Sequence, residues 1–345
     1  MMAKILFSSL LIIFMVTGCT QTITKPTAKP NLPIKDNDLY AGSNYKGNYI
    51  WGGAMNLAWN DLRENVVHAK VELNTNDTAA LQTTFKLNES VFSKKDLDEP
   101  SYYVKSGFGQ KTVELINKES RLKFPDKSFP DLQMNLAENE IIAYAYLLKK
   151  VEYKVEFTEK DVLFNKKVVA GFYADNKWQK YNVDILQYSD DDKFIIALRL
   201  KDEADELILA KGYEQNRVCD IAATIAQLPR SDRQIMLDND VFEMPKLHLD
   251  YSRDYSEMNE KHLANRGFED YEIRQMSERV KFDMDQKGAR VENEAELKFQ
   301  LWDPNKPKSK ILILDKPFWV VMKRANSPNP YFILGVNNAQ LMASR

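Results

Sequence analysis

The longest alternation of apolar and polar residues in this chain lies near its C-terminal end, at 278–301. A first run covers 280–284, a polar break follows, and a second run extends from Ala289 to Leu301. Side chains of an extended chain point to opposite faces with a period of two, so the pattern predicts two strands that each bury one face. The second run is longer than a usual strand and rich in Glu, Asn and Ala, which are poor strand formers. We therefore expect that this second run can lie in a sheet but does not have to do so under all conditions.

The middle of the chain is dominated by further strand patterns. Residues 141–148 form a near-continuous apolar run, which predicts a strand buried on both faces. Residues 151–157 alternate with charge and predict a half-exposed strand, and 81–87 also has a strand-like composition. Four more predicted strands are separated by turn residues: Val162–Phe164, Val168–Tyr173, Tyr181–Gln187 and Phe194–Leu200. Such close succession favours antiparallel pairing.

Helical spacing is confined to shorter stretches. Apolar residues recur at helical intervals from about Ala54 to Val67, and Met258 to Gly267 is typical of a short helix ending at glycine. The chain closes with strand patterns at 318–322 and 331–336, joined by a proline-rich turn, which predict a hairpin. Strands gather in the second half without alternating βαβ units. We therefore predict a mainly antiparallel α+β protein with few helices, folded as a single domain over 49–345.

Composition excludes one class of partner. The chain has 345 residues, of which 44% are hydrophobic, enough for a sizeable core. Lys and Arg number 48 against 50 Asp and Glu, giving a net charge of −2 with both signs interspersed. A nucleic-acid partner is not expected from this balance.

The N-terminus has the layout of an export signal. Lys4 precedes an apolar run that is too short to span a bilayer, and small residues lead to Cys19. The ending Val-Thr-Gly-Cys resembles the lipobox of bacterial lipoproteins, whose cysteine receives acyl chains such as palmitate. We therefore expect a lipoprotein signal peptide at 1–18, then a lipidated Cys19 and a flexible tether over 19–48. Thr20 follows the cysteine in place of the inner-membrane retention residue Asp, so the expected location is the outer membrane of the cell envelope.

The chain carries little that points to catalysis. Its three histidines, His68, His248 and His262, lack the spacing of metal ligands. The stretch 107–112 has two glycines and a lysine, but not the spacing of a phosphate-binding loop. No nucleophile, base and acid stand in a recognisable arrangement. We expect no enzyme activity, no cofactor and no metal site.

The order of four segments resembles the serpin family of serine protease inhibitors. The segments are 141–157, 241–255, 279–295 and 314–338, and the match extends over roughly 138–345. The resemblance implies a serpin-like α+β fold. The region before residue 141 is shorter than the helical half of a usual serpin, so a reduced set of helices is expected.

In inhibitory serpins a protease cuts an exposed loop, and the hinge of that loop then inserts as an extra strand into the central sheet. The resemblance places the hinge at Gly288, Ala289, Val291 and Asn293. Arg290, Glu292 and Glu294 depart from the small residues of inhibitory members. All of these charges nevertheless fall on one face of the alternation, so insertion remains feasible.

The same resemblance places a bait loop before residue 311. Its breaker residues and lysines are typical of exposed segments. Lys306, Lys308 and Lys310 are the candidate cleavage positions, and Lys308 is favoured because Lys306 precedes a proline.

Two functions follow as expectations. The first, slightly favoured by the charged hinge, is a membrane-anchored scaffold that binds another envelope protein. The alternative is a serine protease inhibitor that uses 289–310 as bait.

Overall fold

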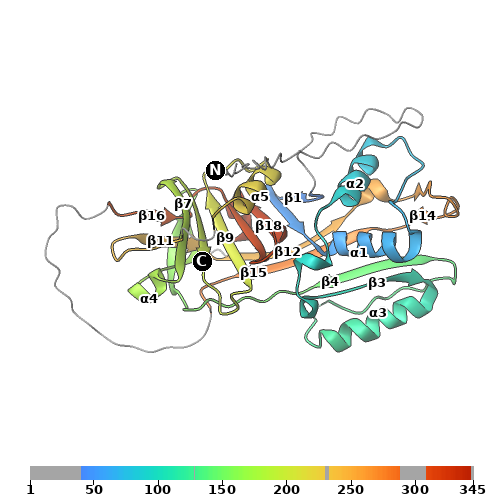
Figure 1. The fold of residues 1–345 in the computed structure, drawn as a ribbon, viewed down its shortest axis with the longest axis horizontal. Coiled ribbons are helices and arrows are strands. Elements are labelled where there is room, and N and C mark those ends of the chain that lie inside the picture. Colours follow the sequence, from blue (N-terminus) through green and yellow to red (C-terminus); the bar gives the residue numbers. More distant parts are fainter. Residues whose placement is uncertain (1–39, 128, 230–232, 288–307, 343–345) are drawn as a thin grey trace, which may run out of the picture. The chain divides into compact units, whose positions relative to one another are not determined.

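The computed structural model describes residues 40–127, 129–229, 233–287 and 308–342. All of them lie in one compact unit, which extends over Ile34–Arg345. Figure 1 shows the ribbon of this unit, with strands from distant parts of the sequence lying side by side.

An eight-stranded antiparallel sheet contains most of the core. Its strands are β1 (Ser43–Tyr45), β2 (Asn48–Gly52), β7 (Val183–Asp190), β8 (Lys193–Leu198), β9 (Asp205–Lys211), β10 (Gln234–Ile235), β17 (Phe318–Arg324) and β18 (Pro330–Val336). They are ordered β1-β2-β18-β17-β9-β8-β7-β10. Every residue of β18 is buried, as are all but the last of β17. Strands covered on both faces read as continuous apolar runs, which is why the closing hairpin was readable from sequence.

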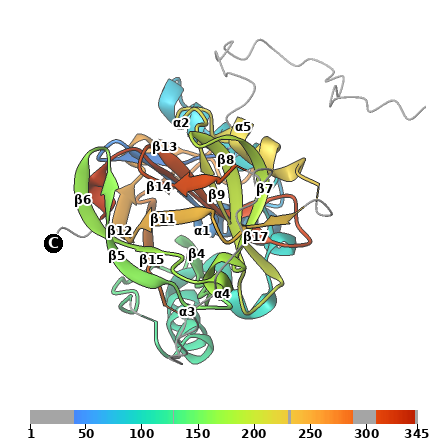
Figure 2. The ribbon, with the colours of Figure 1, turned by 90° about the vertical axis from the view of Figure 1, so that its left-hand side faces the viewer.

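A four-stranded sheet stands at the end of this core where β16 (Ile311–Ile313) joins it (Figure 2). The order is β16, β11 (Val241–Pro245), β6 (Lys167–Tyr173) and β5 (Thr158–Phe164). β11 and β16 pair in parallel, whereas β6 pairs antiparallel with both of its neighbours. The aromatic rings of Phe157, Phe172 and Phe242 meet beneath it, with centroids 5.2–6.2 Å apart.

The other strands of the described residues form three separate pairs. β3 (Tyr102–Phe108) pairs with β4 (Ile141–Leu147), β12 (Leu247–Asp254) with β15 (Ser277–Met284), and β13 (Lys261–His262) with β14 (Glu272–Ile273). All three pairs are antiparallel. Pro245 ends β11, and only Lys246 separates it from β12. Two strands that follow one another directly in the chain therefore belong to two different sheets.

Helices in the described residues are few. They are α1 (Ala54–Leu62), α2 (Thr78–Glu89), α3 (Gly109–Lys123), α4 (Lys177–Lys180) and α5 (Val218–Ala226). α1 continues as a π-helical turn over Arg63–Val67, which ends at His68 in the left-handed region, φ 54°. α3 packs on β3 and β4 through a cluster that includes Tyr103, Ile116 and Tyr146. The predicted helix at 54–67 is thereby confirmed, with a π-helical final turn.

Two local predictions were wrong. The stretch 81–87 lies within α2, because the Asp77 side chain caps the helix by accepting from the backbone N–H groups of Ala79 and Ala80. The expected helix at 258–267 is instead a turn region with β13. Leu263 bridges to Leu73, and Gly267 takes φ 84°. Tertiary packing overrides local propensity in both places.

Two further strand predictions were right only in part. Within the described residues, 151–157 forms an isolated bridge from Tyr153 to Leu200 and no strand, but the predicted half-exposed alternation is confirmed, with Tyr153 and Phe157 buried and Glu152 and Lys154 exposed. The strand at 141–147 exists, but Tyr146 alone is buried and the other six residues are half-buried.

Leu334 tests how much the core depends on the closing hairpin. It is 0% exposed and pairs with Val320 and Ile50. Leu334→Ala should destabilise the fold by about 2–5 kcal/mol because it leaves a cavity. Leu163→Ala, at a position 55% exposed, is the matched control and should change stability by less than about 0.5 kcal/mol. Equal shifts of the two urea unfolding midpoints would contradict this account of the core.

Candidate functional site

The predicted hinge and bait loop connect two described strands. β15 ends at Met284, the chain is described to Lys287, and it is described again from Lys308 into β16. The hinge residues Gly288, Ala289, Val291 and Asn293 lie outside the described residues, as do Lys306 and Cys19. What the structure does describe is the place where the loop leaves the fold and the place where it returns.

The returning end is already attached to a sheet. The backbone N–H of Lys310 donates to Asp240 Oδ1 at 2.8 Å, and its carbonyl accepts from Val241 N at 2.9 Å. Lys308 is exposed, whereas Lys310 is half-buried with its ammonium 5.8 Å from the Tyr188 ring centre. Lys308 is therefore the more accessible of these two lysines. Accessibility matters here because a protease must bind the peptide bond that it cuts in its own active site.

The strand pairs β3–β4 and β12–β15 lie in one layer. Val104 of β3 and Ala145 of β4 pair with each other and pack on the main core. Val280 and Phe282 of β15 pack on the same core, and the Phe282 ring stacks on Phe332 of β18 with centroids 4.7 Å apart. Both pairs thus place apolar side chains on the same hydrophobic core.

Within this layer β4 and β15 run in the same direction. Glu140, just before β4, forms an ion pair with Arg274, just before β15. Beyond the other ends, the N–H of Phe157 donates to the carbonyl of Gln286 at 3.1 Å. The two strands are therefore tied together at their beginnings and beyond their ends (Figure 1).

No backbone ladder joins β4 to β15 in the described parts of the chain. β4 pairs only with β3 there, and β15 only with β12. Among the described residues, β4 and β15 therefore each have one edge without a partner strand, and the backbone N–H and C=O groups of such an edge favour pairing with a further strand. A segment that leaves β15 through Gln286 and turns back would enter antiparallel to both edges.

Phe129, from the segment that follows α3, contacts both strands. Its ring lies 5.8 Å from the ring of Tyr146 on β4. On the other side, the guanidinium of Arg279 and the ammonium of Lys281, both on β15, stand 5.0 and 5.3 Å from its centre. Cation–π contacts of this kind are worth about 0.5–1 kcal/mol each at exposed sites. The two edges are thus joined by a side chain rather than by hydrogen bonds.

A carboxyl group is enclosed where β15 begins. Glu278 is opposite Arg253 on β12, and Tyr255 donates its hydroxyl to Glu278 Oε2 at 3.1 Å. Although the residue is half-buried as a whole, its carboxyl end is enclosed. Burial raises the pKa of Glu278 to about 7, against the opposing effects of Tyr255, Arg253 and the backbone N–H of Met55. Glu278 therefore changes charge near neutral pH.

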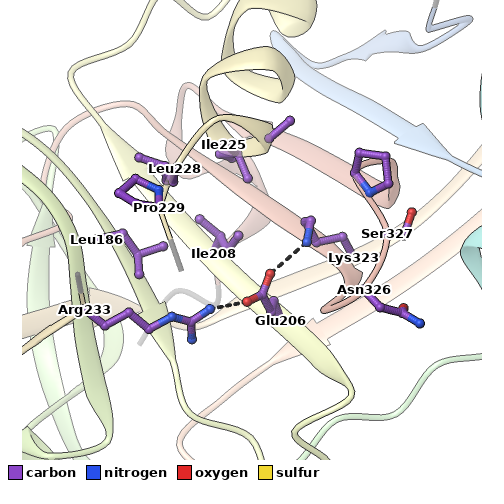
Figure 3. Close-up of a pocket in the computed structure, with 12 residues that line it drawn as sticks. Leu186, Glu206, Ile208, Ile225, Leu228, Pro229, Arg233, Lys323, Asn326 and Ser327 are labelled. Carbon is purple, nitrogen blue, oxygen red and sulfur yellow. Dashed lines mark hydrogen bonds and ion pairs between the residues drawn. The ribbon is translucent and has the colours of Figure 1, made fainter. Parts of the chain in front are cut away.

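Figure 3 shows a second feature, a pocket of about 230 Å³ between α5 and the eight-stranded sheet. Lys323 Nζ donates to Glu206 Oε2 at 2.8 Å, and Arg233 pairs with the other carboxylate oxygen. Burial alone would raise the pKa of Glu206, but the hydrogen bonds and charges of Lys323 and Arg233 outweigh it and hold that pKa below its usual value. These charges satisfy one another, which makes the pocket a stabilising ion-pair site.

Within the described residues, no group of three or more His, Cys, Asp or Glu side chains is arranged to hold a metal ion. Across the same residues, none of the helices has the length and apolar character needed to cross a membrane.

Comparison of the fold with known proteins decides its class. No protein-family model matches the chain, and no curated protein matches its sequence. Solved structures do match. Serpin48 from the insect Tenebrio molitor, described as a highly specific serpin, aligns with a TM-score of 0.51 and 12% identity, covering 85% of this chain and 92% of its own. The mouse protein-Z dependent protease inhibitor aligns with a TM-score of 0.50 and 11% identity, covering 85% and 91%.

The chain has a serpin-like fold. The α+β architecture with mainly antiparallel sheets, predicted from four weak segment matches, is confirmed. The predicted hinge and bait loop belong to the segment that connects β15 to β16.

Neither Glu278 nor Phe129 was predicted from the sequence to lie at the layer of β3, β4, β15 and β12, although the pattern carried a signal for Glu278. Glu278 has the same parity as Val280, Phe282 and Met284, so the alternation itself placed a carboxyl group on the inward face. Phe129 had no such signal, because it lies in an irregular segment whose path depends on tertiary packing.

Glu278 gives a testable pH dependence. Its pKa is higher in the folded chain than in the unfolded chain, so the folded state binds more protons between about pH 4.5 and 7. The stabilisation that the folded chain gains from this extra proton binding is fully present below about pH 4.5, and it is lost as the pH rises towards 7. Glu278→Gln should remove the loss, on the order of 3 kcal/mol, because an amide is neutral throughout.

The measurement is urea unfolding of both proteins at pH 5, 6, 7 and 8. The variant should gain on the parent as the pH rises. A constant difference between the two proteins across the series would show that Glu278 does not titrate in this window.

Proposed function

We propose that this protein is a lipid-anchored, non-catalytic protease inhibitor of the bacterial cell envelope, with residues 289–310 as its bait. The observation that carries the proposal is the relation of β4 to β15. The two strands run parallel in one layer, tied at both ends, without a ladder between them in the described residues. The half-buried apolar surface of β4 is consistent with a position meant for one more strand.

The hinge pattern fits that position. If Ala289 faces the core on insertion, so do Val291, Asn293, Ala295 and Leu297, and every charged residue between them faces solvent. An inserted strand would pair with the facing edges of β4 and β15 and place its own apolar side chains on the core side of the layer. The inward Asn293 costs about 1–3 kcal/mol if it finds no partner. That cost is small beside the burial of several apolar side chains and the new backbone hydrogen bonds.

The descriptions of the two solved structures with a similar fold support the inhibitory assignment. One is described as a highly specific serpin and the other as a protease inhibitor. Exposed Lys308 suits a serine protease that cuts after basic residues.

A scaffold role is the second candidate, and a specific observation favours it. Arg290, Glu292 and Glu294 replace the small residues of inhibitory serpins, and ordering these long side chains in a strand costs conformational entropy that small residues do not lose. In that case the loop serves as a binding surface for another envelope protein.

The parity of the hinge provides the decisive experiment. Purified protein is mixed with trypsin and analysed on denaturing gels for a covalent complex, and the melting temperature is measured before and after loop cleavage. We expect a complex and a clear rise in melting temperature. Ala295→Arg should reduce complex formation at least about tenfold, because it would bury a guanidinium on the inward face.

Glu294→Arg introduces the same side chain on the outward face and is the matched control, with complex formation preserved. Cleavage without a complex or a melting shift in the parent protein would reject inhibition in favour of the scaffold.

The anchor has its own test. Cells fed radiolabelled palmitate should label the parent protein and not Cys19→Ser, which should move from the membrane fraction to the soluble fraction, because acyl chains supply the membrane affinity. The outer membrane is the expected fraction on a density gradient. Retention of Cys19→Ser in membranes would show that another part of the chain holds it there.

A further inference from the structure

The face of β15 that points away from the core carries a row of charges. Val280 and Phe282 pack on the hydrophobic core. The residues that alternate with them, Arg279, Lys281 and Asp283, therefore lie on the opposite face, and all three are exposed. They stand beside an edge of β15 that has no partner strand among the described residues. A strand that paired with this edge would place its own outward residues next to these charges.

The two cations of this row share one carboxylate. Arg279 Nε and Nη2 donate to Asp250 Oδ1 and Oδ2 at 2.9 and 2.8 Å, and Lys281 Nζ stands 3.5 Å from the same Oδ2. Both cations also lie over the ring of Phe129, which contacts Tyr146 of β4. They therefore reach towards the edge that faces β4. Among the described residues, no second carboxylate forms an ion pair with either of them.

The chain begins to turn directly after β15. Asp285 Oδ1 accepts a hydrogen bond from the N–H of Lys287 at 2.7 Å, an arrangement in which an Asp side chain supports a turn. A loop that ends at Gly288 has four residues, which is a common length for a hairpin, and glycine suits the left-handed backbone of such loops. The segment that follows would then return along β15 with Ala289 opposite the buried Met284.

In this register every outward charge of the returning segment meets an opposite charge on β15. Directly opposed residues of two strands lie on the same face of a sheet. The outward pairs are Arg290 with Asp283, Glu292 with Lys281, and Glu294 with Arg279. Opposite charges at such positions stabilise the pairing of two strands, and like charges destabilise it. The two cations that share Asp250 would each gain a carboxylate of their own.

Neighbouring registers do not have this complementarity. A shift of two residues in one direction sets Arg290 against Lys281, and the same shift in the other direction sets Glu292 against Asp283. Both shifts oppose like charges. A shift of one residue would turn the charged side chains towards the core. The charges on the two segments therefore favour a single register.

We propose that residues 289–294 pair with the free edge of β15 in this register, and that Arg290 and Glu292 set it. The inference deepens the proposed function and rests on it for the insertion of the segment. It gives a role to the charges that replace the small residues of inhibitory serpins. They act as partners for charges that β15 already presents.

The three pairs do not contribute equally. Arg279 already makes two hydrogen bonds to Asp250, so Glu294 adds least, and reversal of its charge alone is tolerated. Asp283 contacts the side chain of His248, which is charged only when it is protonated. Arg290 would bring Asp283 a permanent opposite charge. The pair of Arg290 and Asp283 is therefore the one to test.

The test is a charge swap in the full chain, with melting temperatures measured before and after cleavage at Lys308 by trypsin. Arg290→Glu should lower the melting temperature of the cleaved protein by roughly 2–4 °C at low salt, because a repulsive pair replaces an attractive one. Asp283→Lys in the same chain restores the pair in reverse and should recover at least about half of that loss. Screening in 1 M NaCl should remove most of the difference.

Asp285→Lys is the matched control. It reverses the same type of residue two positions further along the same face, where Arg290 would stand in a shifted register. It should not rescue Arg290→Glu. Rescue by Asp285→Lys, or rescue by neither substitution, would overturn the proposed register.

The register and the inhibitory function can fail separately. A covalent complex of the parent protein with trypsin, without rescue by Asp283→Lys, would keep inhibition and reject the register. Rescue without a complex would keep the register and reject inhibition. Rescue that is already present before cleavage would support the register and show that the segment is paired in the intact protein, as the scaffold role requires.

Discussion

The rest of the structure depends on an apolar face shared by two strand pairs. β3–β4 and β12–β15 are not joined to each other by a ladder in the described residues, so their positions are set by what they bury against the eight-stranded sheet. The stacked rings of Phe282 and Phe332 are the closest contact of this kind. Burial of area is non-directional, so it fixes a layer without fixing the spacing of strands within it. The spacing of the two strand pairs within this layer is therefore set by side-chain contacts in the described residues.

Electrostatic contacts at the edges of the layer complement this arrangement. The Glu140–Arg274 pair and the cations around Phe129 lie on exposed or half-exposed groups, where each contact contributes little. Glu278 is different, because its carboxyl group is enclosed and its pKa is raised to about 7. The beginning of β15 is thus sensitive to proton concentration, while the edge beside β4 is held by weak contacts that are easily exchanged.

Sequence patterns predicted the parts of the fold whose neighbours are dictated by burial. The alternation at 280–284 and the closing hairpin were correct because a buried face imposes its own period. The strand prediction at 81–87 failed because a side-chain cap at Asp77 and packing outweighed the strand propensity of its threonines. The missing ladder between β4 and β15 was beyond prediction, because pairing partners far apart in sequence leave no local mark.

The single residue Lys246 between β11 and β12 has a consequence for the loop that connects β15 to β16. β15, from which the loop departs, pairs with β12, and β16, to which it returns, pairs with β11. β11 and β12 are one continuous stretch of chain, 241–254. The strands at both ends of the loop therefore pair with the same short segment of backbone. Cutting the loop therefore releases neither end. The C-terminal fragment stays locked in the middle of the largest sheet through β17 and β18, and the nicked molecule remains one body.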